Sequence, residues 1–500
     1  MQLKPLNTLA KAQPTGSITL DSRKVKPGMI FVAAKGATKQ SQDGHSFISQ
    51  AIQNSCSGLI VETPLNMPID IPVWQASNSR IAAAVLAEQA AGNPSEKLKL
   101  CGVTGTNGKT TVTYLLASIA EAAQKKAGVL GTLGAGSVTQ PKAFGFTTPE
   151  AEDLSALIAS FAKEGFEHIA MEVSSHALAT HRVDGMHFAA AGFTNLSQDH
   201  LDFHGNMADY SAAKMRLFLE LLPEDGVAVV PEIFSHPGAG QNPVSPWRRP
   251  GSSFMGLDAG LRQHDRVLQW GYSPKADIQA SNIQESLDGT ALDLRIINQT
   301  VSIRAPILGR FNIDNLLCAA GLAHATNISL DDIARGLENA RLPAGRLQRV
   351  ANLKPAVFVD FAHTPDALES LLKTMRELST GRLILVFGCG GDRDRQKRPL
   401  MAQVALKNAD KVFVTQDNPR YEDPDQIIAD MQLPSGTTVI HDRKKAIEEA
   451  ISLAKPEDTV LISGKGHETT QQIQERLLPF SDVEIAYENL LNRHKNHQTR

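Results

Sequence analysis

Residues Gly102–Thr111 read GVTGTNGKTT and could hold the phosphates of a nucleotide. The apolar run Leu98–Val103 predicts a strand, and a helical pattern follows the loop. Such a loop can present backbone N–H groups to phosphate oxygens at a helix N-terminus. Lys109 would add a positive charge, and Thr110 a hydroxyl for Mg²⁺. Because Val103 replaces the first glycine of a strict Walker A motif, we interpret the segment as a variant phosphate loop. The alternative is a glycine-rich turn that binds nothing, which leaves the Lys-Thr-Thr ending unexplained.

Three further polar positions could belong to a metal site. Glu172 lies at the end of the predicted strand His168–Val173, where a carboxylate can bind Mg²⁺ or cap the next turn. Residues Asn195–Gly205 read NLSQDHLDFHG, which fits no common zinc spacing and contains no cysteine. Magnesium prefers oxygen ligands over histidine, so a polar loop and a metal shell both remain open for this block. Lys214 lies in a helical pattern and by itself predicts only a solvated lysine.

Polar loops follow predicted strands in the C-terminal part of the chain. Gly388–Arg395 reads GCGGDRDR, Asp417–Arg420 reads DNPR and Gly464–Glu468 reads GKGHE. The carboxyl ends of parallel strands meet at one edge of a sheet, so these loops should form one site. Arginine forks there can pair with carboxylates. Positive and negative groups together suit a zwitterion such as an amino acid.

The elements that must position these residues predict an α/β protein of three domains. Residues 1–97 are expected to form an N-terminal α/β substrate domain, with a linker at Gly92–Ser95. Residues 98–340 should form a central P-loop-type domain with a mostly parallel sheet, because strand and helix patterns alternate. Within it, residues 231–270 are irregular, and Ile278–Ile303 alternates as antiparallel strands do.

Residues 341–500 are expected to form a Rossmann-like C-terminal domain. The predicted strands of this domain are Ala356–Phe361, Leu383–Phe387, Lys411–Thr415, Thr437–Ile440 and Thr459–Ile462. Helical patterns lie between them, for example at Ala367–Glu377 and Arg443–Leu453. No G-x-G-x-x-G motif follows the first strand, so the pattern does not support NAD binding.

Composition narrows the class of protein. The chain has 500 residues, too many for one core, with 42% hydrophobic and 21% charged residues, as in ordinary globular proteins. Its formal net charge of −3 gives no case for non-specific nucleic-acid binding. Its 4 cysteines form no C-x-x-C pair and are expected to be reduced thiols. With no signal peptide or membrane span in the pattern, we expect a cytoplasmic monomer without nucleic-acid or membrane partners.

Together these blocks resemble the Mur ligase family, the ATP-dependent amide ligases of peptidoglycan precursor synthesis. Gly309–Asn315 and Asp360–Leu368 also match, and the resemblance covers nearly the whole chain. Within the family, the DNPR block is typical of ligases that add meso-diaminopimelate to UDP-N-acetylmuramoyl-L-alanyl-D-glutamate. Ligases of the family that add lysine have a different residue at the position of Arg420. A bidentate Arg420 could pair with the extra carboxylate of diaminopimelate, and its unpaired charge would disfavour lysine.

The resemblance implies a role for each matching residue, group by group. ATP would be bound by Gly105, Thr106, Asn107, Gly108, Lys109, Thr110, Thr111, Asn312, Arg346 and Asp360. The catalytic residues would be Lys109, Glu172, His200 and Lys214, and the magnesium ligands Thr110, Glu172, His200 and Lys214 as a carbamate. The UDP-linked substrate would contact Leu20, Ser22, Thr147, Thr148, Ser174, Thr180 and Arg182. Diaminopimelate would contact Arg393, Asp417, Asn418, Pro419, Arg420, Gly464 and Glu468.

The family lysine that matches Lys214 reacts with CO₂ to give an anionic ligand for a second magnesium, which requires a neutral amine and hence a lowered pKa. Three positions depart from the family pattern. Thr180 and Gln348 stand where Gln and Glu are usual, and Pro231 begins a stretch that differs from the usual Asn-Ala-Asp-Asp. Because that stretch lies outside the motifs, we expect altered structure in residues 231–270 and retained activity.

The implied reaction begins when the D-glutamate γ-carboxylate attacks the γ-phosphoryl group of ATP, with charge stabilised by the loop, Lys109 and Mg²⁺. The amine of diaminopimelate then attacks the acyl phosphate. Acyl phosphates hydrolyse, so we expect the third domain to close over the second. Alternatives are a lysine-adding ligase or folylpolyglutamate synthase, an ATP hydrolase acting as a switch or motor, and an inactive binding protein. Arg420 and the N-terminal domain argue against the lysine-adding ligase and against folylpolyglutamate synthase. The intact set Lys109, Glu172, His200 and Lys214 argues against an inactive binding protein.

Overall fold

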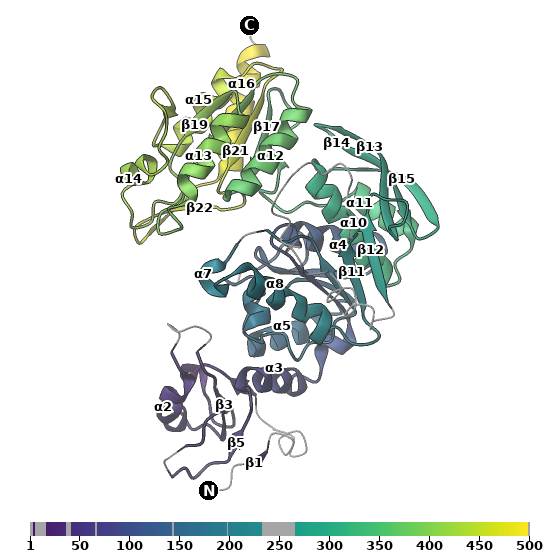
Figure 1. Ribbon diagram of the computed structural model, residues 1–500, viewed down its shortest axis with the longest axis vertical. Coiled ribbons are helices and arrows are strands. Elements are labelled where there is room, and N and C mark those ends of the chain that lie inside the picture. The colour runs from purple at the N-terminus through teal and green to yellow at the C-terminus, as the bar shows by residue number, and fades with distance from the viewer. Residues whose placement is uncertain are drawn as a thin grey trace, which may run out of the picture. The chain divides into compact units, whose positions relative to one another are not determined.

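The computed structural model describes residues 4–5, 17–36, 42–65, 68–142, 145–197, 199–232 and 266–498. Figure 1 labels the helices and strands along the chain. Internal contacts divide the chain into two compact units. Unit 1 comprises Met1–Ser281, Asp293–Ile303 and Asp314–Arg341, and unit 2 comprises Asn282–Leu292, Arg304–Ile313 and Leu342–Arg500. Separate sheets lie within the three predicted domains, whose exact bounds stay a prediction.

The N-terminal sheet has the strand order β1-β5-β4-β3-β2, and its neighbouring strands pair in parallel. Its strands are β1 (Lys4–Pro5), β2 (Ile18–Thr19), β3 (Ile30–Ala33), β4 (Gly58–Val61) and β5 (Val73–Gln75). Helix α2 (Ile48–Gln53) packs on one face and α3 (Ser79–Ala90) on the other. Helix α3 begins after Asn78, whose side chain accepts the N–H groups of Arg80 and Ile81, as an N-cap residue should.

The central sheet has the order β15-β14-β13-β12-β11-β10-β6-β9-β7-β8. Its strands are β6 (Lys99–Thr104), β7 (Ala127–Gly131), β8 (Gly134–Gly136), β9 (His168–Glu172), β10 (Ala190–Phe193), β11 (Val227–Pro231), β12 (Val267–Gly271), β13 (Ile278–Ser286), β14 (Gly289–Ile296) and β15 (Gln299–Ala305). From β7 to β13 every neighbouring pair is parallel. Two-residue connections join β13 to β14 and β14 to β15, which makes them antiparallel hairpins, as the alternating pattern predicts.

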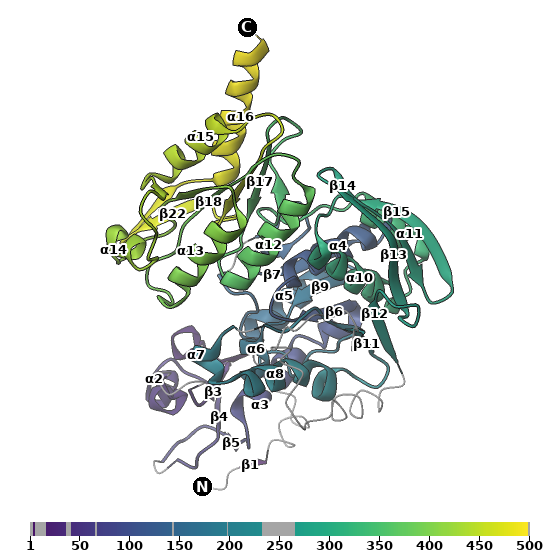
Figure 2. The ribbon, with the colours of Figure 1, turned by 45° about the horizontal axis from the view of Figure 1, so that its top comes forward.

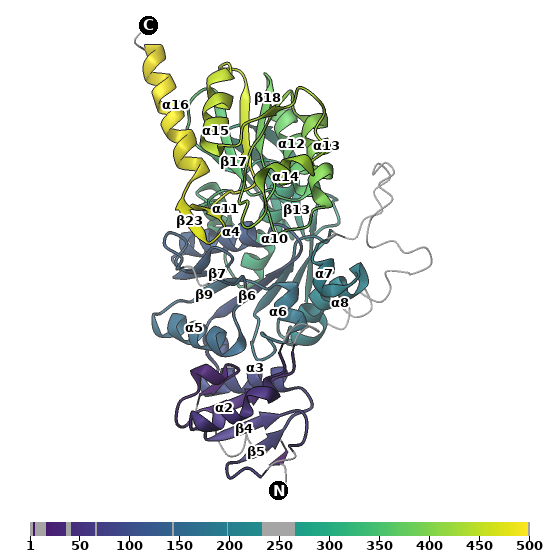
Figure 3. The same cartoon turned by 90° about the vertical axis from the view of Figure 1, so that its left-hand side faces the viewer.

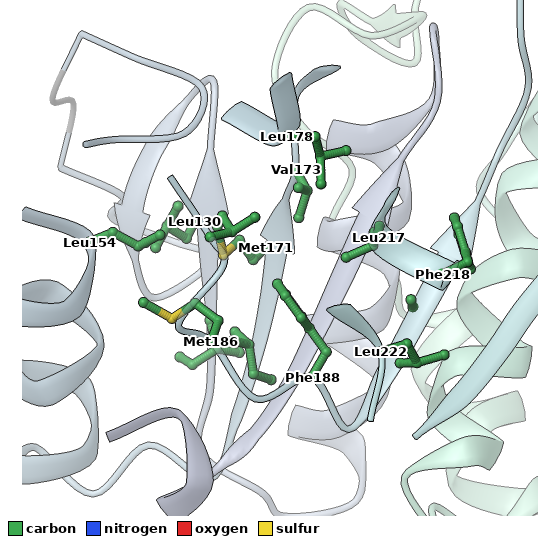
Figure 4. Packing of buried hydrophobic residues seen from close by; sticks show 14 of the residues in the cluster. Leu130, Leu154, Met171, Val173, Leu178, Met186, Phe188, Leu217, Phe218 and Leu222 are labelled. Atoms are coloured by element: carbon green, nitrogen blue, oxygen red, sulfur yellow. The ribbon is translucent and has the colours of Figure 1, made fainter. Parts of the chain in front are cut away.

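Helices cover the central sheet and bury its strands. They are α4 (Lys109–Ala122), α5 (Ala151–Lys163), α6 (Ser175–Ala179), α7 (Leu201–His204), α8 (Met207–Arg216), α10 (Arg310–Ala325) and α11 (Leu330–Glu338). Figure 4 shows the core on one face, where Met171 of β9 lies toward Leu154 of α5, and Val173, the residue after β9, lies near Leu178 of α6. Strand β6 is buried along its length after Lys99, and this burial fixes where the following loop begins at the edge of the sheet.

The C-terminal sheet has the order β16-β17-β21-β18-β19-β20, with β17 to β20 parallel, as a Rossmann-like domain requires. Its strands are β16 (Gln348–Arg349), β17 (Ala356–Asp360), β18 (Leu383–Phe387), β19 (Lys411–Val414), β20 (Thr438–Val439) and β21 (Thr459–Ser463). Helices α12 (Pro365–Leu378), α13 (Lys397–Asn408) and α14 (Pro424–Ala429) pack on one face. Helices α15 (Arg443–Leu453) and α16 (Asp482–Gln498) pack side by side on the other (Figures 2 and 3).

A separate hairpin, β22 (Thr470–Ile473) and β23 (Arg476–Pro479), follows the last strand of this sheet. The predicted irregular stretch 231–270 falls mostly on residues 233–265, which lie outside the described residues, so the expectation for it stays a prediction. In the described part of the chain, the helices are all too short or too polar to cross a bilayer.

Candidate active site

The glycine-rich loop connects β6 to α4, as the sequence predicts. Gly108 is the residue before the helix and has φ +86°, and a Cβ atom there would lie 2.1 Å from the Asn315 side-chain oxygen, so the loop requires glycine. The Asn107 N–H donates to Asn195 Oδ1 over 2.9 Å, which ties the loop to the NLSQDHLDFHG block. Thr110 and Thr111 are buried in the first turn of α4.

Two lysines meet at one backbone oxygen of this loop. Lys109 Nζ donates to the carbonyl oxygens of Gly105 and Thr106, over 2.9 and 2.8 Å. Lys214 Nζ, from α8, donates to the same Gly105 oxygen over 2.8 Å and is 1% exposed. Burial, and then the neighbouring Lys109 charge, hold the pKa of Lys214 well below its usual value. A neutral, nucleophilic amine is therefore favoured at position 214.

A hydroxyl and a carboxylate lie together beside the loop. Thr110 Oγ1 donates to Glu172 Oε1 over 3.0 Å, and both residues are buried. The Thr132 N–H and hydroxyl donate to the two Glu172 oxygens over 2.9 and 3.2 Å, which fixes the carboxylate at the end of β9. These hard oxygen donors fit Mg²⁺. Among the described residues, no group of three or more His, Cys, Asp or Glu side chains is arranged to hold a metal ion. Other oxygen donors would therefore have to complete the coordination shell of a magnesium ion here.

His200 and Tyr210 border the same loop. His200 precedes α7 with φ +52°, and its ring centroid lies 4.7 Å from that of His176 and 6.2 Å from that of Tyr210. The Tyr210 hydroxyl is 3.1 Å from Thr106 Oγ1, and Lys214 Nζ is 4.5 Å from the Tyr210 ring centroid. Burial raises the pKa of Tyr210 to about 12. Tyr210 is not among the predicted site residues, although it precedes Lys214 by one turn on the same helix face.

The residues predicted to contact the muramoyl peptide gather around the end of β9. Thr148 Oγ1 donates to the Glu172 carbonyl oxygen over 2.9 Å and accepts the Ser174 N–H over 3.2 Å. Arg182 Nη1 donates to the Thr148 carbonyl oxygen over 2.9 Å. Thr147 Oγ1 lies 3.0 Å from Thr132 Oγ1. Of the predicted set, Thr180 is buried and donates its hydroxyl to the His176 carbonyl oxygen over 2.7 Å.

Acidic residues at the start of α5 connect this cluster to the N-terminal sheet. Glu152 Oε1 accepts the Leu20 N–H over 3.0 Å, and burial raises the pKa of Glu152. Glu150 pairs with Arg182 at 2.9 Å and with Arg80 at 3.6 Å. Ser22, which is buried, donates its hydroxyl to Gln50 Oε1 over 2.7 Å. Neither Arg80 nor the two glutamates are predicted site residues, because only long-range contacts reveal them.

Unit 2 holds the remaining predicted nucleotide residues. The Asp360 carboxylate accepts the Leu347 and Ala362 N–H groups over 2.6 and 2.7 Å, and burial raises its pKa against the opposing charge of Arg346. The Arg346 guanidinium lies 4.6 Å from the Phe361 ring centroid. Asn312 is buried and donates its side-chain N–H to the Leu308 carbonyl oxygen over 2.9 Å.

The three C-terminal loops meet at the carboxyl edge of their sheet, as predicted. Arg420 has φ +52°, and its Nη1 donates to the Gly391 carbonyl oxygen over 2.7 Å. Burial, and then the Arg393 charge, lower the pKa of Arg420, whereas Asp417 and Glu468 act in the opposite direction. Two guanidinium groups thus lie near two carboxylates within one small region, which suits a ligand with both charges.

Asn418 and Glu468 face one another in the same site. Asn418 Nδ2 donates to Glu468 Oε2 over 2.7 Å, and Lys465 Nζ donates to both side chains. Gly464 has φ +119°, and a Cβ atom there would lie 2.7 Å from Asp417 Oδ2, so glycine lets the carboxylate approach. Pro419 is buried between Asn418 and Arg420. Lys465 is not a predicted site residue, although it stands inside the GKGHE block.

A phosphate loop with a paired acidic residue, together with a doubly wound domain that carries a charged loop cluster, defines a nucleotide-dependent α/β enzyme class. Comparison with known families refines this. Residues 103–239 and 250–323 match the Mur ligase middle domain, and residues 345–466 match the Mur ligase glutamate ligase domain. The chain belongs to the Mur ligase family.

Relatives match the chain over nearly its whole length. The UDP-N-acetylmuramoyl-L-alanyl-D-glutamate–2,6-diaminopimelate ligase of Xylella fastidiosa is 40% identical, over 97% of this chain and 96% of the relative. A ligase of the same name from Geobacillus thermodenitrificans is also 40% identical, over 94% of each chain. A solved ligase of that name has a TM-score of 0.69 and 33% identity, over 96% of this chain and 95% of that one.

More distant structures share the fold. A MurF ligase from Thermotoga maritima, solved in complex with ADP, is similar with a TM-score of 0.60 and 18% identity. That similarity spans 97% of this chain and 99% of the other. This similarity shows that the two chains share a fold.

Proposed function

We propose that this protein is an ATP-dependent ligase that joins meso-diaminopimelate to the D-glutamate residue of UDP-N-acetylmuramoyl-L-alanyl-D-glutamate. The relatives that cover nearly the whole chain carry this activity in their names. The reaction would supply a precursor of peptidoglycan. We further propose that the enzyme works as a monomer in the cytoplasm, in keeping with its buried free thiols at Cys56, Cys101, Cys318 and Cys389.

The charged loop cluster of unit 2 carries the proposal. Diaminopimelate has two amino-acid heads, so its bound form needs partners for carboxylates and for ammonium groups. Arg393 and Arg420 are suited to the carboxylates, and Asp417 and Glu468 to an ammonium group. The distal head distinguishes diaminopimelate from lysine by one carboxylate. An Arg420 left without that anion would keep an unpaired, partly buried charge, which disfavours lysine.

ATP binding is supported by the loop that connects β6 to α4. Its N–H groups and the α4 N-terminus favour phosphate binding. Lys109 Nζ donates to carbonyl oxygens of the same loop, and a phosphate bound there would offer it an alternative acceptor. Thr110, Glu172, His200 and carbamylated Lys214 would hold magnesium, which when bound neutralises phosphate charge. Asn312, Arg346 and Asp360 are proposed as further nucleotide contacts.

The reaction has two steps, phosphoryl transfer and amide formation. The γ-carboxylate oxygen of D-glutamate forms a bond to the γ-phosphorus of ATP, and the bond to the ADP oxygen breaks, which gives an acyl phosphate and ADP. The diaminopimelate amine then forms a bond to the acyl carbon. Phosphate leaves, and the amine loses a proton as the amide forms. The chain holds both substrates in place, with the UDP-linked peptide near Leu20, Ser22, Thr147, Thr148, Ser174, Thr180 and Arg182.

Lys214 can be tested for carbamylation without an activity assay. A neutral Lys214 amine adds to CO₂ to form a carbamate and releases a proton. We expect a carbamate carbon signal by NMR when the protein is equilibrated with ¹³C-bicarbonate. Lys214→Met should abolish that signal, whereas Lys411→Met should retain it, because Lys411 is only half-buried and its Nζ donates to Thr438. A spectrum that is identical for Lys214→Met and the wild type would contradict the proposal.

The ligase activity is tested by phosphate release with ATP, the UDP-linked dipeptide and a panel of amino acids. We expect release that depends on meso-diaminopimelate and is far weaker with lysine. Arg420→Lys should raise the KM for diaminopimelate about ten- to hundredfold, because a bidentate charge-assisted pair is lost. Release that ignores the amino acid would indicate an ATP hydrolase, and equal release with lysine would indicate a lysine-adding ligase.

A further inference from the structure

Lys465 lies at the centre of the charged loop cluster but cannot contact a ligand. It follows β21, and its side chain is 0% exposed. Its Nζ donates to Asn418 Oδ1 over 2.9 Å and to Glu468 Oε2 over 2.8 Å. Glu468 is proposed above to bind diaminopimelate, and the family resemblance implies the same for Asn418. A buried lysine therefore connects the DNPR loop to the GKGHE loop.

The contacts of Asn418 fix the orientation of its amide. Its Oδ1 atom accepts from Lys465 Nζ and also from the Gln472 N–H over 2.9 Å. Two donors on one atom identify that atom as the oxygen, so the NH₂ group must face Glu468. Asn418 Nδ2 then donates to Glu468 Oε2 over 2.7 Å. Lys465, Asn418 and the backbone of β22 thus determine one another's positions.

This arrangement leaves one Glu468 oxygen available. Both Lys465 and Asn418 donate to Oε2. The described residues provide no hydrogen bond to Oε1, and the Glu468 side chain is 31% exposed. A carboxylate held rigidly by one oxygen can present the other to a ligand ammonium group at low entropic cost.

Burial of the Lys465 ammonium has a cost that the pair with Glu468 must offset. Removing a charge from water is unfavourable unless hydrogen-bonding and charged partners compensate closely. An apolar side chain could fill the same volume without that cost. The exchange would leave Glu468 Oε2 with one donor and Asn418 Oδ1 with only the Gln472 N–H. The charge therefore contributes to the position of the two ligand-facing residues rather than to packing.

We propose that Lys465 is a positioning residue for the amino-acid substrate, which orients Asn418 and Glu468 so that Glu468 Oε1 receives an ammonium group of meso-diaminopimelate. This inference rests on the proposed function. Lys465 acts through Glu468, so its removal should weaken binding of the amino acid and leave the other two substrates unaffected.

The test compares Lys465→Met with Lys411→Met by steady-state kinetics. Lys411 also lies in the C-terminal sheet, but at the start of β19, away from the carboxyl edge, where its Nζ donates to Thr438 over 2.7 Å. Lys465→Met should raise the KM for diaminopimelate about ten- to hundredfold, the loss expected for hydrogen bonds to a charged group. The KM values for ATP and for the UDP-linked dipeptide should change less than twofold, and Lys411→Met should leave all three unchanged.

A double-mutant cycle tests whether Lys465 acts through Glu468. Glu468→Gln alone should also raise the KM for diaminopimelate, and Lys465→Met should add little in the Glu468→Gln background. Lys465→Gln, which keeps one donor, should be intermediate and serves as the second variant if Lys465→Met folds poorly. Equal losses for all three substrates, or independent effects of the two substitutions, would overturn the positioning role. A wild-type enzyme without diaminopimelate-dependent phosphate release would instead overturn the proposed function, and with it the role of Lys465.

Discussion

Two buried lysines in this protein have opposite electrostatic surroundings. Lys214 shares the Gly105 carbonyl oxygen with the cation Lys109, and the pKa of Lys214 is held low by burial and by that like charge. Lys465 has the carboxylate of Glu468 at 2.8 Å. The first environment favours a neutral amine that can react, whereas in the second the hydrogen bonds to Glu468 and Asn418 hold the Lys465 side chain in place. The same residue type is thus proposed to have a chemical role in one unit and a positioning role in the other.

His467 should make stability depend on pH. Burial, and then the charge of Arg346, lower its pKa from 6.5 to about 4. The unfolded chain therefore binds more protons between these values, so stability is complete above pH 6.5 and falls as the pH is lowered toward 4. The loss is at most about 3 kcal/mol. His467→Asn should remove this part of the pH dependence, measured by thermal melting from pH 4 to pH 7.5.

The comparison at pH 7.5 is the control for His467, because the ring is neutral there in both folded and unfolded wild type. Any difference between His467→Asn and the wild type at that pH reports packing against Phe361, whose ring centroid is 5.0 Å away. The effect of His467 protonation is the additional difference in stability between the two proteins that develops below pH 6.5. An unchanged pH slope in the variant would contradict the prediction.

At the scale of elements, the connection from β6 to α4 depends on one glycine. Gly108→Ala would place a methyl group 2.1 Å from the Asn315 oxygen at φ +86°. Gly28→Ala has a nearly equal φ of +89° with no atom within 4 Å of the added Cβ. The second variant isolates the backbone strain, about 1–2 kcal/mol. We expect Gly108→Ala to lose more stability and to bind ADP more weakly in calorimetry, while Gly28→Ala binds ADP normally.

Helices α15 and α16 are joined at their N-termini by a fully buried ion pair. Arg443 Nη2 lies 2.7 Å from Asp482 Oδ2 and also donates to the Ser463 carbonyl oxygen over 3.0 Å. Asp482→Asn would leave a buried guanidinium without its charge partner. Removing one member of such a pair costs about 3–5 kcal/mol. We expect urea unfolding of the variant at a clearly lower midpoint than that of the wild type.

The matched control for Asp482→Asn replaces both members of the pair. Arg443→Met with Asp482→Leu removes both charges, so it should recover much of the loss. Arg23→Ala, which breaks an exposed pair with Asp21, should leave the urea midpoint nearly unchanged, because water screens such a pair. A double variant as unstable as Asp482→Asn would indicate that the hydrogen bond to Ser463 dominates.

Elements with strong local patterns were predictable from sequence. The predicted strand Leu383–Phe387 and helix Arg443–Leu453 have the bounds that the structure shows, because an unbroken apolar run defines the first and Asp442 caps the second. The hairpin β22–β23 was not predicted, because its strands are half-buried or exposed and show no apolar alternation. Strand β7 was also missed, since its glycine-rich sequence has low strand propensity.

The site was predictable only where motifs follow strands. The meeting of Asn418 with Glu468 follows from parallel strands that end at one edge. The hydrogen bond from Leu20 to Glu152 joins residues far apart in sequence, so no local sequence pattern predicts it. Lys465 shows a third case, because its block was visible in the sequence but its burial was not. Chemistry could thus be read from residue types, and positioning only from the fold.

At the scale of the whole molecule, the phosphate loop and the proposed amino-acid site belong to different compact units. The loop Gly105–Gly108 lies in unit 1, and the loops that carry Arg393, Arg420 and Glu468 lie in unit 2. Each unit has its own hydrophobic core. Multidomain chains of this kind commonly unfold in more than one transition. A ligand that binds one unit alone should then stabilise that unit alone.

Differential scanning calorimetry with meso-diaminopimelate as the only ligand tests this. We expect two transitions, of which diaminopimelate raises one, by about 2.7 kcal/mol at a hundredfold excess over Kd. The raised transition should be the one that Asp482→Asn lowers, and the unmoved one should be lowered by Gly108→Ala, because these residues lie in units 2 and 1. Lysine at the same concentration should move neither transition, since it lacks the carboxylate that we propose Arg420 binds. A single transition, or equal shifts of both, would mean that the units fold as one and that the binding energy of the amino acid is shared by the whole chain.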